Sequence, residues 1–222
     1  LLRYRDDQVA LIFKGESRDT VQMTYAELYD EVSKLAQYLK ELGVGPDDRV
    51  AGFMPNMPQT IVAMLAATSL GAAWSSCSPD FGIKGVLDRF GQIKPKILFT
   101  ADGYLFKGKE LDSLTRVGDI LKDLPSIEKV IVVPYVQENP DISHVKNAVS
   151  YPEITAGYRP ADIEFAQLPS DHPLYIMFTS GTTGLPKCMV QSTGGILIHH
   201  MKELMLHADL KREDNIFYFT TC

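Results

Sequence analysis

Apolar and polar positions alternate along the chain in a way that predicts strands and helices in turn. Short apolar runs bounded by polar residues or glycine are typical of buried strands, and longer segments with an apolar residue every three or four positions are typical of helices. The predicted strands cover residues 9–13, 49–54, 72–77, 96–100, 129–133, 174–178, 188–190 and 215–221. The predicted helices cover residues 25–42, 59–70, 83–93, 111–124 and 195–207.

The first helix has start and stop signals of its own. Thr24 and Glu27 have the spacing of a capping box, in which the two side chains satisfy backbone N–H groups at a helix start. Gly43 follows the last apolar position and is placed to end the helix. The segment therefore predicts a helix with one buried face.

The order of the elements predicts an α/β fold. Strands that alternate with helices of ten or more residues favour right-handed crossovers and a mostly parallel sheet with helices on both faces. Residues 136–173 are rich in proline and show no clear period, so we interpret them as a long surface connection. We thus expect an α/β subdomain over 1–135, this connection, and a final segment over 174–222.

One uncharged stretch resembles a membrane span. Residues 50–79 contain no charged side chain, but Pro55 and Pro58 interrupt the first part, and the apolar run over 61–74 is too short to cross a bilayer. A buried helix followed by a buried strand is the better interpretation.

Composition restricts the kinds of partner and the cellular compartment that we expect for this chain. The chain of 222 residues is 45% hydrophobic, enough for a substantial core, and its net charge of −6 argues against nucleic acid or an anionic membrane as partner. Cys77, Cys188 and Cys222 are scattered and lack C-x-x-C spacing, which suits a reducing compartment and predicts a cytoplasmic protein. The first residue is Leu1 rather than methionine, and we expect the chain to be cut from a longer one.

The segment with the clearest chemistry is the loop 179–187, Thr-Ser-Gly-Thr-Thr-Gly-Leu-Pro-Lys, between two predicted strands. Glycine lets backbone N–H groups approach a ligand, and hydroxyls and a lysine supply donors for phosphate oxygens. The spacing does not match the G-x-x-x-x-G-K-[ST] pattern of P-loop nucleotide triphosphatases. The loop therefore predicts an anion site of another kind.

This loop resembles the phosphate-binding signature [ST]-S-G-[ST]-T-G-x-P-K of the adenylate-forming superfamily, which includes acyl-CoA synthetases, luciferases and peptide-synthetase adenylation domains. The segments 53–58, 101–104 and 188–195 are most similar to the acyl-CoA synthetases. The resemblance implies that the chain is part of a large N-terminal AMP-binding domain. It assigns contacts with the phosphates of ATP to Thr179, Ser180, Gly181, Thr182, Thr183, Gly184 and Lys187.

The resemblance also implies a reaction. The carboxylate of a short-chain acid, acetoacetate first and acetate as the alternative, would attack the α-phosphate of Mg-ATP, releasing pyrophosphate before transfer to CoA. The lysine that drives adenylation in this family lies in a C-terminal domain absent here, so we assign no catalytic residue and no metal ligand and expect this chain alone to be inactive. A non-catalytic nucleotide- or pyrophosphate-binding module remains open. A phosphotransferase would need a magnesium-binding acid and a base that the sequence does not place.

The loop 103–109 carries a second candidate contact. Its lysines and glycines, taken alone, are typical of a solvated turn. In related enzymes the corresponding loop carries arginines that meet the phosphates of CoA. Lys109 matches one of these by charge, whereas Phe106 stands where another arginine would be. The resemblance therefore implies that Lys109 contacts CoA.

Several other residues have simpler interpretations. His199, Glu203 and His207 are four apart, so on an α-helix they would share a face that could bind a metal. A solvated polar face is the favoured interpretation, because the H-E-x-x-H pattern is absent. The hydroxyls of Ser192 and Thr193 are expected to cap the last helix. Trp74, Cys77 and Cys188 are expected to be core residues.

Overall fold

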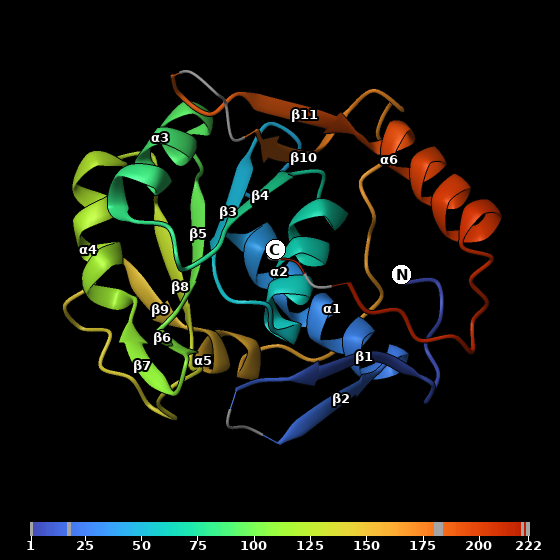
Figure 1. Ribbon diagram of the computed structural model, residues 1–222, viewed down its shortest axis with the longest axis horizontal. Helices are drawn as coiled ribbons and strands as arrows, with labels where there is room; N and C mark the ends of the chain where they lie inside the picture. The colour runs from blue at the N-terminus through green and yellow to red at the C-terminus, as the bar shows by residue number, and fades with distance from the viewer. Residues whose placement is uncertain (1, 17–18, 180–183, 219, 221–222) are drawn as a thin grey trace.

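The computed structural model describes all residues except 1, 17–18, 180–183, 219 and 221–222. Its centre is a seven-stranded sheet in the order β11-β10-β4-β3-β5-β8-β9 (Figure 1). β10 and β11 are antiparallel, and the other neighbouring pairs are parallel. The predicted α/β class with a mostly parallel sheet is confirmed. The strands are β3 (Arg49–Phe53), β4 (Ala73–Cys77), β5 (Ile97–Ala101), β8 (Lys129–Val133), β9 (Ala148–Ser150), β10 (Pro173–Phe178) and β11 (Cys188–Ser192).

The order in which the chain adds strands to the sheet reverses at β3. The chain runs from β3 to its neighbour β4 and then crosses back to β5 on the other side of β3. Val50 of β3 accordingly lies in register with Trp74 of β4 and with Ile97 of β5. In open α/β sheets, ligands bind outside the carboxyl ends of the strands near such a reversal. The fold thus directs attention to the loops that follow β3, β4 and their neighbours.

Helices α1 (Tyr25–Glu41), α2 (Pro58–Ser69) and α5 (Tyr151–Ala156) cover one face of the sheet. The predicted capping box of α1 is present: Glu27 N–H donates to Thr24 Oγ1 at 3.1 Å, and Thr24 N–H donates to Glu27 Oε2 at 2.8 Å. Gly43 follows with φ at +68°, a conformation that glycine adopts without strain. The start and end of α1 agree with the prediction.

The uncharged stretch 50–79 resolves into β3, α2 and β4. Val62, Ala63 and Ala66 of α2 are completely buried against the sheet, which explains why this helix has no charged face. Among the described residues, no helix is both long and apolar enough to span a membrane. The predicted buried helix and strand are confirmed.

Helices α3 (Ile83–Ile93) and α4 (Leu114–Asp123) cover the opposite face. Val86, Phe90 and Ile120 are completely buried there, and they recur at helical spacing along their helices. The predicted helix 111–124 began too early, because residues 109–112 form a strand. The limits of α3 match the prediction.

Two antiparallel hairpins lie outside the main sheet. They are β1 (Val9–Lys14) with β2 (Thr20–Thr24), and β6 (Gly103–Phe106) with β7 (Lys109–Asp112). The turn of the second hairpin is Lys107-Gly108, with φ values of 52° and 75°, as a two-residue hairpin loop of type I′ requires. Neither β2 nor the β6–β7 hairpin was predicted. The strands of the β6–β7 hairpin are four residues each, which is too short a pattern to detect.

A buried carboxylate joins the end of β5 to the segment after β8. Asp102 follows β5 and is 5% exposed. Its two oxygens accept hydrogen bonds from the backbone N–H groups of Tyr135 at 2.6 Å, Val136 at 3.0 Å and Gln137 at 2.8 Å. These bonds satisfy the desolvated carboxylate and fix the course of the chain beyond β8.

The predicted connection 136–173 contains more structure than expected. β9 and α5 occupy residues 148–156, so the prediction was wrong there: β9 extends the sheet beyond β8 in parallel, and α5 packs beside α1. The later part runs along α1, where Ser33 Oγ donates to Ala161 O at 2.7 Å and Ile163 N–H donates to Tyr29 OH at 2.8 Å. These side chains of α1 hold the connection in place.

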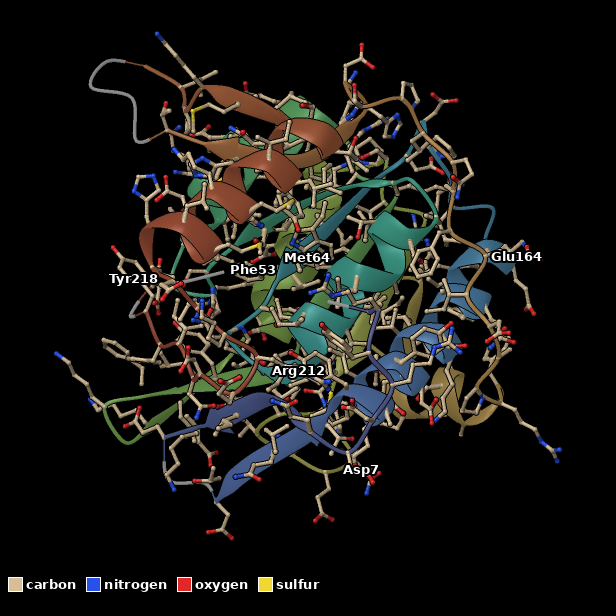
Figure 2. All side chains as sticks on the ribbon, turned by 90° about the vertical axis from the view of Figure 1, so that its right-hand side faces the viewer. Asp7, Phe53, Met64, Glu164, Arg212 and Tyr218 are labelled. Atoms are coloured by element: carbon tan, nitrogen blue, oxygen red, sulfur yellow. The ribbon has the colours of Figure 1, made fainter. Side chains whose placement is uncertain are left out.

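The last described segment differs from the prediction. α6 (Thr193–His200) continues as a π-helix, η1 (Met201–His207), so the extent of the predicted helix was right but its second half has a different period. The strand predicted over 215–221 is wrong for the described part, where residues 215–218 form no strand and Phe217 is 86% exposed. Just before it, the chain returns to the chain start, where Arg212, labelled in Figure 2, pairs with Asp6.

Candidate functional site

The predicted phosphate loop connects β10 to β11 at an edge of the sheet. At its base the Thr179 N–H donates to Lys187 O at 3.1 Å, which extends the antiparallel pairing of the two strands. Thr179 is half-buried, and Lys187 is exposed. The predicted contacts Ser180, Gly181, Thr182 and Thr183 lie outside the described residues. The structure therefore describes the two stems of the loop and brings the first and last predicted residues together.

Gly184 shows why the loop needs glycine. Its φ is +92°, in a region that side-chain-bearing residues rarely adopt, and an added Cβ would meet no atom within 4 Å. The requirement is therefore conformational and not one of space. Gly184 lies three residues before Lys187, so its backbone conformation helps set where the chain re-enters β11.

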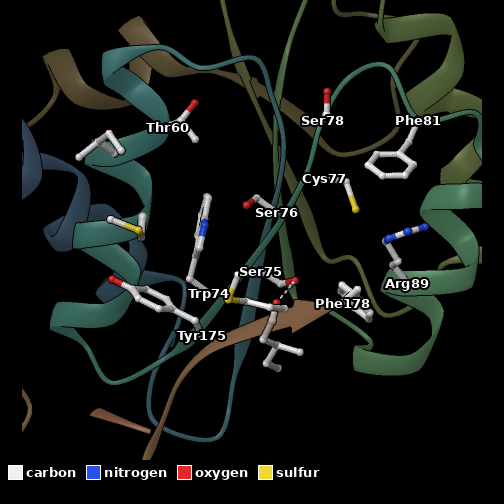
Figure 3. A pocket seen from close by; sticks show the side chains of 14 residues that line it. Thr60, Trp74, Ser75, Ser76, Cys77, Ser78, Phe81, Arg89, Tyr175 and Phe178 are labelled. Atoms are coloured by element: carbon white, nitrogen blue, oxygen red, sulfur yellow. Dashed lines mark hydrogen bonds between the residues drawn. The ribbon is translucent and has the colours of Figure 1, made fainter. Parts of the chain in front are cut away.

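A cavity of about 410 Å³ lies under the loop stems, between α2 and α3 and beside β4 and β10 (Figure 3). Trp74 and Tyr175 line it on the side of α2, and Cys77, Phe81 and Arg89 line it on the side of α3. β10 pairs with β4 at Tyr175 and Trp74, and the residues that follow in each strand also line the cavity. The cavity thus lies toward the carboxyl ends of these strands, which is where α/β folds bind ligands.

Burial favours the neutral form of two titratable side chains that line the cavity. Burial raises the pKa of the Cys77 thiol to about 12, although nearby Arg89 acts in the opposite direction. Burial also raises the pKa of Tyr175. A thiol with so high a pKa is neutral near pH 7 and is a poor nucleophile. Cys77 is therefore the buried core residue that the sequence predicted.

Cys188 does not fit its prediction. It is exposed, because β11 is the edge strand of the sheet, although Cys77 at the centre is 2% exposed. The Cys188 Sγ lies 3.5 Å from Gln92 Oε1, to which it donates. Cys222 lies outside the described residues. The sequence pattern of β11 identified a strand but not its position at the sheet edge.

Lys109 lies away from the phosphate loop. It begins β7, is exposed, and is in register with Phe106 across the hairpin. Figure 1 shows β6 and β7 on the opposite side of the molecule from β10 and β11. The hairpin turn contacts the first hairpin, since the Lys107 N–H donates to Glu16 Oε2 at 3.1 Å and the Gly108 N–H donates to Glu16 Oε1. The structure does not join Lys109 to the loop 179–187 in one site.

His199, Glu203 and His207 do not form a described metal site. Their predicted common face assumed an α-helix, but Glu203 and His207 lie in the π-helix, which has a longer turn. Glu203 instead pairs with Lys202 at 2.7 Å, and this hydrogen bond lowers the pKa of Glu203. Within the described ranges no group of three or more His, Cys, Asp or Glu side chains could hold a metal ion. Of the two predicted caps, Ser192 caps α6 and accepts from the Gly195 N–H at 3.3 Å, whereas the Thr193 hydroxyl contacts Pro169 O and Ser170 O instead.

The sequence did not identify the contribution of α3. The guanidinium carbon of Arg89 lies 4.2 Å from the ring centre of Phe81 and 5.8 Å from that of Phe178. Gln92, one turn further on, contacts the end of the phosphate loop. A polar residue on a helix surface gives no local signal of such partners, so sequence patterns could not have found them.

The chain matches the family model described as AMP-binding enzyme over residues 2–221. The acetoacetyl-coenzyme A synthetase of Rhizobium meliloti (strain 1021) is 47% identical over 223 residues, and the acetoacetyl-CoA synthetase of Mus musculus is 46% identical over 228 residues. Each alignment covers 100% of this chain and 34% of the relative. The chain thus spans about a third of the length of these curated relatives.

A solved structure gives the same result in three dimensions. Acetoacetyl-CoA synthetase from Streptomyces lividans superposes with a TM-score of 0.90 at 44% sequence identity. The superposition covers 97% of this chain and 32% of that one. The arrangement of sheet, helices and loop stems described above is therefore similar to that of a solved protein.

Proposed function

The chain belongs to the AMP-binding enzyme family, and from that premise we propose that it is part of an ATP-dependent acid–thiol ligase forming acetoacetyl-CoA from acetoacetate, ATP and CoA. The observation that supports this acyl substrate is the identity of 44–47% to acetoacetyl-CoA synthetases over 100% of the chain. A synthetase for another short-chain acid, such as acetate, is the alternative.

The proposed reaction has two steps. A carboxylate oxygen of acetoacetate attacks the α-phosphorus of ATP, and the bond from that phosphorus to the oxygen bridging to the β-phosphate breaks, so that pyrophosphate leaves. The CoA sulfur then bonds to the acyl carbon, the thiol proton passes to solvent, and AMP leaves with the electrons of the broken acyl–oxygen bond. The mixed anhydride makes the acyl carbon reactive, because adenylate is a far better leaving group than the carboxylate oxygen it replaces.

The phosphate loop supports the first step by holding the substrate. Phosphoryl transfer depends mainly on positioning and on charge stabilisation, both of which a loop of N–H groups, hydroxyls and one lysine supplies. In this proposal Thr179, Gly184 and Lys187 contact the β- and γ-phosphates, together with the predicted residues 180–183. Magnesium enters as part of Mg-ATP, bound to the phosphate oxygens. Lys109 is the proposed contact for a phosphate of CoA.

The cavity beneath the loop fits a chain that binds substrate and does not supply the catalytic base. Its lining is mainly apolar, and the pKa values of Cys77 and Tyr175 are raised by burial. Neutral groups of this kind shape a binding space and exclude water, but they do not supply a base at neutral pH. We therefore propose that the adenylating lysine acts from a separate C-terminal domain and that this chain of 222 residues has no ligase activity alone. The proposed location is the cytoplasm, and the proposed role is in lipid and ketone-body metabolism.

The first experiment measures thioester formation by the protein at its natural length with Mg-ATP, CoA and either acetoacetate or acetate. We expect kcat/KM to be higher for acetoacetate, and a preference for acetate would replace the proposed substrate. Lys187→Met should raise the KM for ATP by roughly tenfold or more, as loss of a charge-assisted contact predicts. The matched control is Lys122→Met, because Lys122 is an exposed lysine of α4 that pairs with Asp119.

A second experiment separates the ligase from a binding module. Calorimetry with pyrophosphate and with Mg-ATP is performed on both the 222-residue chain and the protein at its natural length. Binding by both, with thioester formation by the longer protein alone, is the expected result. Binding without thioester formation by either would identify a non-catalytic module, and thioester formation by the 222-residue chain would contradict the division proposed above.

A further inference from the structure

Helix α3 supports both stems of the phosphate loop. Arg89 and Gln92 are three residues apart and therefore lie on the same face of this helix. Arg89 faces Phe178, the residue before the loop, and Gln92 contacts Pro186 and Cys188, at the end of the loop. One helix face thus contacts the chain where it enters the loop and where it leaves.

Gln92 contacts both neighbours of Lys187. Its Nε2 donates to Pro186 O at 2.9 Å, and its Oε1 accepts from the Cys188 thiol at 3.5 Å. The same Nε2 donates to Asp88 O at 2.5 Å, one turn back in α3, which restricts the rotamers of the side chain. The amide therefore contacts the backbone of the residue before the loop lysine and the side chain of the residue after it.

Arg89 contacts the other stem. Its Nη1 donates to Gly85 O at 2.8 Å, which holds the guanidinium against the helix. The guanidinium carbon lies 4.2 Å from the ring centre of Phe81, and the ring of Phe178 lies beyond at 5.8 Å. These contacts place a cation between two aromatic rings, one after β4 and one at the end of β10.

The loop stems need such support because of where they lie in the sheet. β11 is the edge strand, and β10 is in register with β4 at the single described pair of Tyr175 and Trp74. Helix α3, in contrast, is anchored by Val86 and Phe90, which are completely buried. A well-anchored helix beside two stems at the edge of the sheet can hold them in one geometry, and preorganised donors bind phosphate better than mobile ones.

We infer that Gln92, assisted by Arg89, is a positioning residue that holds Lys187 and the loop stems in the geometry needed to bind the phosphates of ATP. This inference rests on the proposed function. Neither residue needs to touch the nucleotide, since Gln92 acts through Pro186 and Cys188 and Arg89 acts through the ring of Phe178. The effect is predicted on ATP and pyrophosphate affinity and not on the stability of the whole fold.

The chain offers a close control for Gln92. Gln37 of α1 is also a helix glutamine whose Nε2 donates to the carbonyl four residues back, Ser33 O at 3.2 Å, and to a distant loop carbonyl, Arg159 O at 2.9 Å. The loop that Gln37 holds is the connection over α1 and not the phosphate loop. Both glutamines bond the carbonyl four residues back in their own helix, and they differ in the loop that they hold. Removing each amide therefore separates the effect of holding the phosphate loop from the effect of losing a helix glutamine.

The experiment compares Gln92→Ala, Gln92→Met and Gln37→Ala in the protein at its natural length. Gln92→Met keeps the length of the side chain and removes its amide. We expect both Gln92 variants to raise the KM for ATP and the Kd for pyrophosphate by about three- to tenfold, as loss of one hydrogen bond predicts. The kcat and the KM for the acid should stay close to those of the parent. Gln37→Ala should leave all of these constants unchanged, and equal constants for the parent and both Gln92 variants would overturn the inference.

Hydrogen exchange tests the inference independently of any ligand. The Thr179 amide, which donates to Lys187 O, should exchange faster in both Gln92 variants and not in Gln37→Ala. Unchanged exchange in the Gln92 variants would overturn the positioning role even if nucleotide binds. Faster exchange in a protein that binds neither ATP nor pyrophosphate would support the structural part of the inference and contradict the proposed function, so the two failures are distinguishable.

Discussion

The hydroxyl of Ser75 donates a hydrogen bond of 2.7 Å to the carbonyl oxygen of Ile176, and both residues are buried. The bond joins β4 to β10 beside the cavity, next to the single described register pair between these strands (Figure 3). One side-chain hydroxyl therefore supplements a short backbone pairing. The contact therefore helps to hold β10, and the loop that follows it, beside β4.

The first prediction concerns Ser75 itself. Ser75→Ala should lower the free energy of unfolding by about 1–2 kcal/mol, because the buried Ile176 carbonyl loses a donor. Urea unfolding measures the loss. The neighbouring Ser76→Ala is the control, since Ser76 is half-buried on the other side of the same strand and should change stability less. Equal effects of the two substitutions would contradict the importance of the bond.

The second prediction concerns the buried carboxylate of Asp102. Asp102→Asn replaces one acceptor oxygen by an N–H donor that faces backbone N–H groups of residues 135–137. The free energy of unfolding should fall by about 3 kcal/mol, because charge-assisted bonds are lost in a buried site. Asp119→Asn, at an exposed carboxylate that pairs with Lys122, should cost at most about 0.5 kcal/mol. If urea unfolding gave a similar loss of unfolding free energy for both variants, the structural role assigned to the Asp102 carboxylate would be wrong.

The third prediction uses Trp74 as a reporter of the cavity. A Cβ at Gly52 would lie 2.8 Å and 2.9 Å from two ring atoms of Trp74, so Gly52→Ala must displace the ring. Overpacking of this kind costs about 1–3 kcal/mol. Because the chain has a single tryptophan, its fluorescence emission reports the displacement directly. An unchanged spectrum and unfolding midpoint would show that the ring does not lie against Gly52.

Gly118→Ala is the counterpart to Gly52→Ala. Gly118 lies inside α4, and an added Cβ would meet no atom within 4 Å. The substitution should raise stability by about 0.5–1 kcal/mol, because alanine loses less backbone freedom on folding than glycine. The tryptophan emission should not change in this variant. Opposite signs for the two glycines distinguish steric conflict from a general effect of alanine.

The fourth prediction concerns acid stability at the start of α1. The Thr24 backbone N–H, and then its hydroxyl, hydrogen-bond the Glu27 carboxylate and lower its pKa below the ordinary 4.5. Because the pKa of Glu27 is lower in the folded state than in the unfolded state, its carboxylate stabilises the fold above pH 4.5. This stabilisation is lost as the pH falls through the folded pKa. Glu27→Gln should therefore be less stable than the parent at pH 7, and the difference should shrink at pH 3. Urea unfolding at both pH values measures this, and a constant difference would contradict the linkage.

The local parts of the fold could be predicted because their causes are local. The capping box of Thr24 and Glu27 and the uniformly apolar α2 depend on residues a few positions apart, and the structure has both. The β6–β7 hairpin was missed because its strands are four residues each. Cys188 was misjudged because an apolar run does not reveal whether its strand lies at the centre or the edge of a sheet.

The sequence by itself determined the alternation of strands and helices, the family resemblance and the composition of the loop 179–187. The tertiary structure decided what holds that loop. Gln92 and Pro186 are 94 positions apart, and they meet because the order of strands in the sheet brings α3 beside β10 and β11. Helix and strand periods are set by neighbouring residues, whereas such a contact depends on how the elements pack. The side chains that support the loop therefore appear on the sequence as ordinary polar residues of a helix surface.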